Sequence, residues 1–221
     1  MLKRAYVSVA QTMLAAPMSG CYASASLTGH QTAPGSLRRW FASLGAIYHL
    51  ERMLALDIPW WNVAATRAVE AFLAARPGAR VFEYGSGAST IWLARRSERV
   101  ISVEHDADWA RALGERVRDH SNVELICAPY ALSGPAETQP YVRAIANTGA
   151  HDLIVIDGRL RAACLAAAMS ALRPGGIILF DDSGRARYRG AIAHCGLAEE
   201  HFRGLSYCVP YPDHSSILRA A

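Results

Sequence analysis

Residues 80–96 read RVFEYGSGASTIWLARR, and this stretch decides the fold class. A short apolar run ends on Glu83, the chain turns on Gly85-Ser86-Gly87, and a helix-like sequence follows. Glycines at such a turn let the backbone bend tightly and approach a ligand, and the free N–H groups of the next helix favour an anionic group. The stretch therefore predicts a strand, a ligand-binding turn and a helix, in that order.

Strand and helix signals alternate from this stretch onward. The predicted strands are 80–84, 100–104, 123–127, 152–157 and 177–182, and the predicted helices are 89–96, 107–120, 141–147 and 160–172. Short, almost continuous apolar strands between helices are typical of a parallel sheet covered on both faces. Residues 199–220 read as two strands joined by a Pro- and Tyr-rich loop, which predicts a terminal antiparallel hairpin.

The region before the first strand has a different pattern. Residues 1–36 mix small and polar residues without a period and predict a loosely ordered arm. From Leu37 to Leu54, apolar residues at three- and four-residue steps predict one amphipathic helix. This helix either packs on the main domain or serves a membrane surface or a partner. Pro59 ends it, a second helix is expected over 63–75, and the predicted division is 1–58 and 59–221.

Composition limits the function classes. The chain has 221 residues and a net charge of +4, which is too mild to predict nucleic-acid binding. Its five cysteines form no C-x-x-C pair and favour reduced thiols in the cytoplasm. No apolar run approaches the roughly 20 residues that span a bilayer, so stable membrane insertion is not expected. The basic start resembles an export signal weakly, since Gln11 interrupts its apolar stretch. The oligomeric state stays open.

A second acid points to a nucleoside. Glu104 ends the second strand, nineteen positions after Gly85, where an acid can accept hydrogen bonds from ribose hydroxyls. A dinucleotide fingerprint wants a third glycine where Thr90 stands, which counts against a pyrophosphate-containing ligand. An NAD-dependent oxidoreductase and a non-catalytic nucleoside-binding or scaffold protein remain as alternatives.

Four blocks, VFEYGSGAST, VISVEHD, DLIVIDGR and LRPGGIILFDDS, carry a family resemblance. In this order they resemble the class I S-adenosylmethionine-dependent methyltransferases, above all a bacterial group with EYGSGxST, SVEHD and IDGRxR blocks. The resemblance covers about residues 60–218. It implies a Rossmann-like, doubly wound α/β fold with a seven-stranded, mostly parallel sheet, a C-terminal antiparallel hairpin, and S-adenosyl-L-methionine as cofactor.

The resemblance also implies site residues. Glu104 would hold the ribose, Ala128 and Pro129 would lie near the adenine, and Asp157 would face the reacting methyl group. The residues that would border the cofactor are Glu83, Tyr84, Gly85, Ser86, Gly87, Ser89, Thr90, Glu104, His105, Ala128, Pro129 and Asp157. Trp60-Trp61-Asn62 would close over the cofactor, or else the two tryptophans pack in the core.

Methyl transfer to a hydroxyl or amine also needs the acceptor's proton removed. The expected base is Asp157 or His214. A magnesium ion on Asp157, Asp181 and Asp182 is the alternative means, as in the catechol-type O-methyltransferases. Arg185, Arg187 and Arg189 either pair with an anionic substrate or form the exposed face of a helix. The expected acceptor is a small molecule or glycan precursor, with oxygen the preferred acceptor atom.

Overall fold

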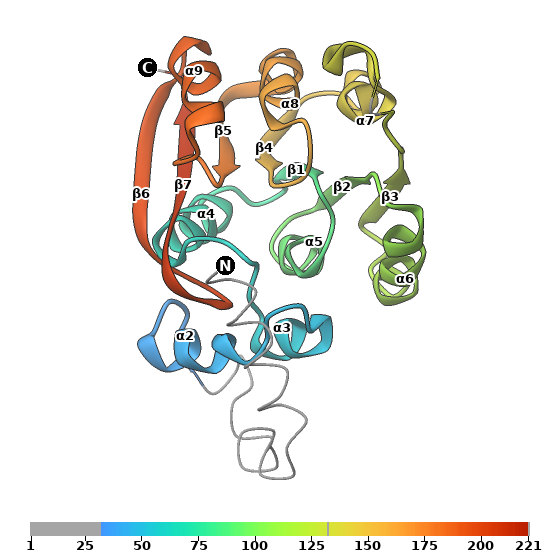
Figure 1. The fold of residues 1–221 in the computed structure, drawn as a ribbon. Coiled ribbons are helices and arrows are strands. Elements are labelled where there is room, and N and C mark those ends of the chain that lie inside the picture. The colour runs from blue at the N-terminus through green and yellow to red at the C-terminus, as the bar shows by residue number, and fades with distance from the viewer. Residues whose placement is uncertain (1–31, 132, 221) are drawn as a thin grey trace.

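The computed structural model describes residues 32–131 and 133–220. The arm predicted over residues 1–36, with the export-like start and Cys21, lies almost entirely outside the described residues. Strands alternate with helices along the chain, as the sequence predicts (Figure 1). The strands are β1 Arg80–Tyr84, β2 Arg99–Glu104, β3 Val123–Cys127, β4 His151–Ile156, β5 Leu172–Asp181, β6 Ala198–Ser206 and β7 Val209–Arg219.

The strands form one seven-stranded sheet in the order β3-β2-β1-β4-β5-β7-β6. Strands β1 to β5 pair in parallel, whereas β7 runs antiparallel to both β5 and β6. The fold is therefore a Rossmann-like, doubly wound α/β fold with a terminal hairpin, as expected. The chain order reverses between β1 and β4, and ligands of open α/β sheets bind beyond the carboxyl ends of the strands at such a point.

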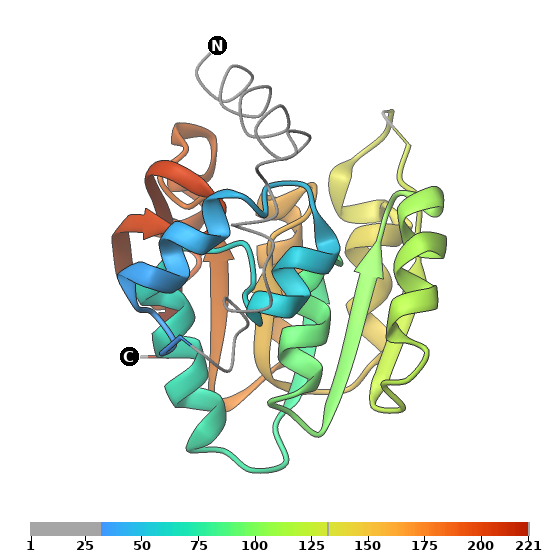
Figure 2. The same ribbon diagram turned by 90° about the horizontal axis from the view of Figure 1, so that it is seen from below.

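Helices cover both faces of the sheet (Figures 1 and 2). Their bounds are α4 Val63–Ala74, α5 Ala88–Ala94, α6 Ala107–Val117, η4 Ala136–Thr138, α7 Pro140–Arg143, η5 Ala144–Asn147, α8 Arg161–Ala168, η6 Met169–Ala171 and α9 Ala186–His194. One core lies between α7, α8, α9 and the strand residues around Phe82 and Ile154, and the other lies between α4, α5 and Val81 and Val155. Alternate residues of a strand face opposite sides, which is why each central strand feeds both cores.

The first amphipathic segment forms two helices, where the sequence predicts one. They are α2 Leu37–Leu44 and α3 Leu50–Leu56, separated by a turn in which Tyr48 has a φ of 56°. Ala46 and Ile47 of this turn are buried against Tyr207 and Cys208 of the β6–β7 hairpin. Packing of the turn into this core replaces the continuous helix that the apolar period alone predicts.

Candidate active site

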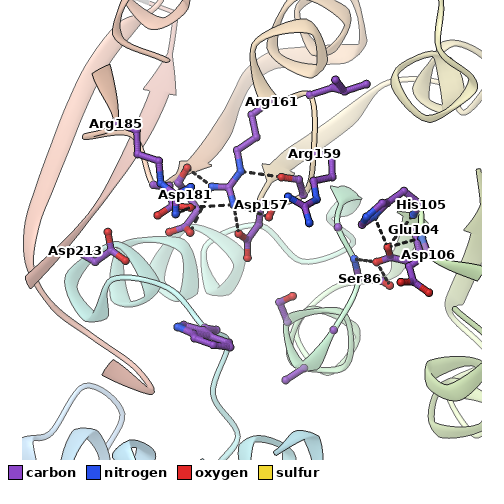
Figure 3. Close-up of a pocket in the computed structure, with 18 of the residues that line it drawn as sticks. Ser86, Glu104, His105, Asp106, Asp157, Arg159, Arg161, Asp181, Arg185 and Asp213 are labelled. Atoms are coloured by element: carbon purple, nitrogen blue, oxygen red, sulfur yellow. Dashed lines mark hydrogen bonds and ion pairs between the residues drawn. The ribbon is translucent and has the colours of Figure 1, made fainter. Parts of the chain in front are cut away.

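A cavity of about 1110 Å³ opens at the carboxyl ends of the strands (Figure 3). The loops after β1, β2, β4 and β5 form its floor. Tyr48, Leu50 and Met53 from the α2–α3 region line another wall, and Tyr211 and His214 of β7 line a third. The cavity exceeds the upper end of the roughly 300–1,000 Å³ range that is usual for a single ligand. It has room for a cofactor together with a small second ligand.

The glycine turn after β1 lines the cavity with its backbone. Gly85, with a φ of +94°, lies against the backbone of Gly158, and a Cβ at Gly85 would stand 2.6 Å from the Gly158 Cα. A Cβ at Gly87 would meet nothing within 4 Å, so the space beside Gly87 is open to a ligand. Ser86, Ala88 and Ser89 are cavity residues as well. This part of the turn lies where the sequence places it.

Glu104 lies at the junction of the turn and β2. Its Oε2 accepts hydrogen bonds from the Ser86 backbone N–H (3.1 Å) and hydroxyl (2.9 Å). Its Oε1 accepts from the N–H groups of His105 (2.8 Å) and Asp106 (3.0 Å). Trp109 donates from Nε1 to the Ser86 carbonyl at 2.9 Å. These bonds fix a carboxylate at the edge of the cavity, with the His105 ring beside it and 5.4 Å from the Tyr130 ring.

Several predicted cofactor residues do not line the cavity. Glu83 is fully buried below the turn and accepts hydrogen bonds from Ser89 (2.5 Å), Thr90 (2.5 Å) and Ser102 (2.7 Å). Burial raises the pKa of Glu83 to about 7, against the three hydroxyl donors. Glu83 and Thr90 therefore stabilise the glycine turn from the protein interior and do not line the cavity.

Tyr84, Ala128 and Pro129 also lie away from the cavity. The Tyr84 side chain is buried on the face of the sheet opposite to that of Glu83. Its hydroxyl donates there to the Val142 carbonyl at 2.7 Å. Ala128 is buried in the same core, and Pro129 is exposed. Tyr130, one residue further along, takes the cavity position that the sequence assigns to them. The alternation of the strand decides which of these residues reach the cavity.

Asp157 follows β4 and lies in the middle of the cavity floor. Its Oδ2 accepts a hydrogen bond from Nε1 of the fully buried Trp61 at 3.0 Å, and its Oδ1 accepts from Arg161 Nη2 at 2.9 Å. Burial raises the pKa of Asp157, and Arg161 opposes this shift. Trp61 thus packs in the core and also holds Asp157, while Trp60 lines the cavity and Asn62 caps α4.

The three predicted metal ligands converge, but on a guanidinium. Arg161, 7% exposed, has its nitrogens 2.9 Å from Asp157, 3.6 Å from Asp181 and 3.1 Å from Asp182. It also donates to the carbonyls of Asp157, Gly158 and Asp181. Burial alone would lower the pKa of Arg161, yet the three carboxylates raise it.

This arrangement corrects the magnesium prediction. The Arg161 guanidinium lies among the three carboxylates, where Mg²⁺ would have to bind, so the residues as folded do not fit the ion. Within residues 32–131 and 133–220, no cluster of His, Cys, Asp or Glu is arranged to hold a metal. Arg161 lies four residues after Asp157, but Asp157 precedes α8, so the i,i+4 spacing rule for helices did not predict this pair.

His214 lines the cavity from β7, as the predicted position of a base requires. Its Nδ1 lies 2.9 Å from Nε2 of His201, whose Nδ1 is 3.0 Å from the Ser216 hydroxyl. Burial, followed by the neighbouring His201, lowers the pKa of His214 below 6.5. The lowered pKa favours the neutral imidazole, which is the form that can accept a proton.

Comparison with known proteins agrees with this geometry. Residues 82–183 match a family described as a methyltransferase domain. Together with the fold, the match supports an S-adenosylmethionine-dependent methyltransferase. The matched segment runs from β1 to the end of β5 and includes the glycine turn, Glu104 and Asp157. No curated protein matches this chain.

Solved structures of other proteins share the fold. One is a precorrin-6y C5,15-methyltransferase from Geobacter metallireducens, 14% identical, covering 71% of this chain and 88% of that one, with a TM-score of 0.55. Another is a precorrin 8w decarboxylase from Methanobacterium thermoautotrophicum, at 16% identity, 75% and 94% coverage, and a TM-score of 0.53. A third is an rRNA methylase from Streptococcus thermophilus, at 16% identity, 71% and 96% coverage, and a TM-score of 0.52.

The acceptor is not decided by these likenesses. The similar folds include an RNA methylase as well as a methyltransferase named for a precorrin, so the expectation of no nucleic acid stays a prediction. In the part of the chain that the structure describes, every helix is too short or too polar to span a bilayer.

Proposed function

We propose that this protein transfers the methyl group of S-adenosyl-L-methionine to a small-molecule or glycan-precursor acceptor, preferably to an oxygen atom, in the cytoplasm. The observation that carries the proposal is one continuous cavity joining Ser86 and Glu104 at one end to Asp157 and His214 at the other. A cofactor and an acceptor in such a cavity lie side by side, and alignment of the two is the main requirement of an in-line displacement.

The cofactor end would use the turn and Glu104. Four donors of the protein already bind the Glu104 carboxylate, and a ribose hydroxyl would take the place of the Ser86 hydroxyl at Oε2. The open space at Gly87 would receive the methionine half, and the His105 and Tyr130 rings offer a surface for the adenine. The cofactor supplies an electrophilic methyl carbon on a positively charged sulfur. Asp157 would lie beside that charge, held in place by Trp61 and Arg161.

The acceptor end would supply the base. We assign the proton acceptor to His214 in the tautomer that donates from Nδ1 to His201 Nε2, because Nε2 of the neutral ring then has a lone pair for the acceptor's proton. Attack by the acceptor oxygen forms the O–CH₃ bond and breaks the S–CH₃ bond, and the acceptor proton passes to His214. Asp157 is the less suitable base, because two donors already occupy its carboxylate. Its role would be to orient.

Calorimetry tests the cofactor. Wild type should bind S-adenosylhomocysteine and not NAD. Glu104→Ala should weaken this binding by about tenfold to a hundredfold, the usual loss for hydrogen bonds to a charged group. Glu124→Ala, which removes an exposed carboxylate on neighbouring β3, is the matched control. NAD binding alone would overturn the proposal, and unchanged affinity in Glu104→Ala would overturn the placement of the ribose.

Radiolabel transfer tests the acceptor class. With tritiated-methyl cofactor and a cell extract separated into small molecules and RNA, label should enter the small-molecule fraction. His214→Asn should lower kcat and leave S-adenosylhomocysteine affinity unchanged. The wild-type rate should fall on the acid side of the pH profile as His214 becomes protonated. Label confined to RNA would exclude the proposed acceptor class.

A further inference from the structure

Four arginines line the acceptor end of the cavity. Arg159 and Arg161 follow β4, and Arg185 and Arg187 follow β5. Two of the four are already neutralised. Arg161 is enclosed by carboxylates, and Arg185 Nη2 lies 2.6 Å from Asp182.

The other two arginines have no such partner. Within residues 32–131 and 133–220, neither Arg159 nor Arg187 forms an ion pair with a carboxylate, and both side chains are exposed. The Arg187 guanidinium lies over the Tyr188 ring at 4.7 Å. Arg189, the third member of the predicted cluster, is occupied: its two terminal nitrogens contact the Glu199 carboxylate at 2.7 Å each. Arg187 thus differs from Arg185 and Arg189, whose guanidinium groups form ion pairs with Asp182 and Glu199.

The carboxylates of this region are engaged elsewhere. Asp181 accepts a hydrogen bond from Ser215 at 2.7 Å and Asp182 is shared by Arg161 and Arg185. Asp213 accepts from the His214 N–H at 2.8 Å, and burial raises its pKa. These three carboxylates are therefore occupied by groups of the protein. The guanidinium groups of Arg159 and Arg187 remain available to a ligand. Figure 3 shows Arg159 beside Asp157, on the loop opposite Arg185.

We propose that the methyl acceptor carries a carboxylate or phosphate group that Arg159 and Arg187 bind. The inference rests on the proposed function and names the acceptor's chemical class. β4 and β5 are neighbouring parallel strands, and Arg161 contacts residues at the ends of both, so the segments that carry Arg159 and Arg187 leave neighbouring strands and line the same cavity. The planar fork of arginine matches carboxylate and phosphate oxygens, and the anion would hold the acceptor with its reacting atom beside Asp157.

The α2–α3 turn favours a small acceptor over a polymer. Tyr48, Leu50 and Met53 line the cavity, and Met53 packs in one apolar core with Ala88, which directly follows the glycine turn. An isolated small anion fits such a site more easily than a nucleic-acid backbone, which needs an extended basic surface.

Calorimetry with inorganic phosphate and with acetate tests the proposal, on the protein with and without S-adenosylhomocysteine. At constant ionic strength, at least one probe should bind saturably. Arg159→Gln and Arg187→Gln should each weaken that binding by about tenfold. The double variant should abolish it. Arg38→Gln, which removes an exposed arginine outside the cavity, should bind as wild type does.

The outcomes are separable. Phosphate binding alone assigns a phosphorylated acceptor, and binding of both probes assigns the shared oxyanion chemistry. Absence of binding by either probe, or full binding by the double variant, overturns the inference. Arginine-dependent binding of a short single-stranded RNA without binding of the small anions also overturns it. If the wild-type protein does not bind S-adenosylhomocysteine, the proposed function is wrong. The titration with phosphate or acetate in the absence of S-adenosylhomocysteine still shows whether Arg159 and Arg187 bind an anion.

Discussion

Glu83 shows how a single residue of the glycine turn serves the fold rather than the ligand. Its carboxyl is enclosed by Ser89, Thr90 and Ser102, and burial raises its pKa from 4.5 to about 7. The native state therefore keeps this proton to a higher pH than the unfolded chain does. Its contribution to stability is fully present below pH 4.5 and is lost as the pH rises toward 7.

Glu83→Gln should remove this pH dependence. Between pH 4.5 and pH 8, the free energy of unfolding of wild type should fall by about 3 kcal/mol relative to the variant. His151 also makes the stability depend on pH, because burial lowers its pKa to about 4, but it is present in both proteins. The difference between their free energies of unfolding therefore reports on Glu83. Urea unfolding across the pH range measures it, with Glu124→Gln as the exposed control. Parallel curves for wild type and Glu83→Gln would contradict the buried titration.

Gly158 is required by a close approach between two loops. A Cβ there would stand 1.9 Å from the Tyr141 hydroxyl and 3.0 Å from the Gly85 backbone. Gly158→Ala should therefore lower the free energy of unfolding by about 1–3 kcal/mol, the usual cost of overpacking. Gly190→Ala, within α9 where a Cβ meets nothing within 4 Å, should instead be neutral or stabilising by up to about 1 kcal/mol. Equal effects of the two substitutions in urea unfolding would refute the steric argument.

At the scale of elements, Arg161 joins the ends of β4 and β5 to the start of α8. Its side chain contacts two strand-end carbonyls and three carboxylates, and it is almost fully buried. The same residue takes the place that a divalent cation would need. Substitution of Arg161 therefore tests two things: its contribution to stability, and whether its guanidinium excludes a divalent cation.

Arg161→Ala should lower the free energy of unfolding by about 3–5 kcal/mol, because it leaves buried carboxylates without their counter-ion. Mg²⁺ or Mn²⁺ should raise the Tm of this variant, since the space and the oxygen ligands become available. EDTA and added Mg²⁺ should leave the Tm of wild type unchanged. Arg111→Ala, on the exposed face of α6, is the control. A rise in the wild-type Tm with Mg²⁺ would show that the guanidinium does not exclude the metal.

Across the whole molecule, the α2–α3 region and the β6–β7 hairpin form one core although they lie far apart in sequence. Trp40 donates from Nε1 to the Ser206 carbonyl at 2.9 Å, and the Cys208 N–H donates to the Ser43 hydroxyl at 3.0 Å. Ile47 is buried between them, whereas Phe41 of the same region is 63% exposed. The cavity wall that includes Tyr48 therefore depends on the hairpin.

Ile47→Ala should destabilise the protein by about 2–4 kcal/mol and weaken S-adenosylhomocysteine binding, because the wall at Tyr48 loses its support. Phe41→Ala should change the stability by less than about 0.5 kcal/mol. Urea unfolding and calorimetry on both variants measure the two effects. Unfolding of Ile47→Ala in two separate steps would mean that this region is independent of the sheet.

The sequence by itself determined the order of strands and helices, the terminal hairpin and the turn that carries Ser86. These features depend on the local period of apolar residues and on the backbone conformations open to glycine. Both can be read from residues that are close together in the sequence. The acid at Glu104 was also predictable, since a fixed spacing brings the ends of adjacent parallel strands together.

The tertiary structure alone decided which predicted residues reach the cavity. Glu83 and Tyr84 follow one another in sequence, but strand alternation buries them on opposite faces. The Asp157, Asp181 and Asp182 carboxylates could equally have bound a metal, and only the packing of α8 places Arg161 among them. Likewise, Arg189 differs from Arg187 in that the folded chain brings the Glu199 carboxylate of β6 to it. Charge pairing over long sequence distances is set by three-dimensional proximity, which no local pattern encodes.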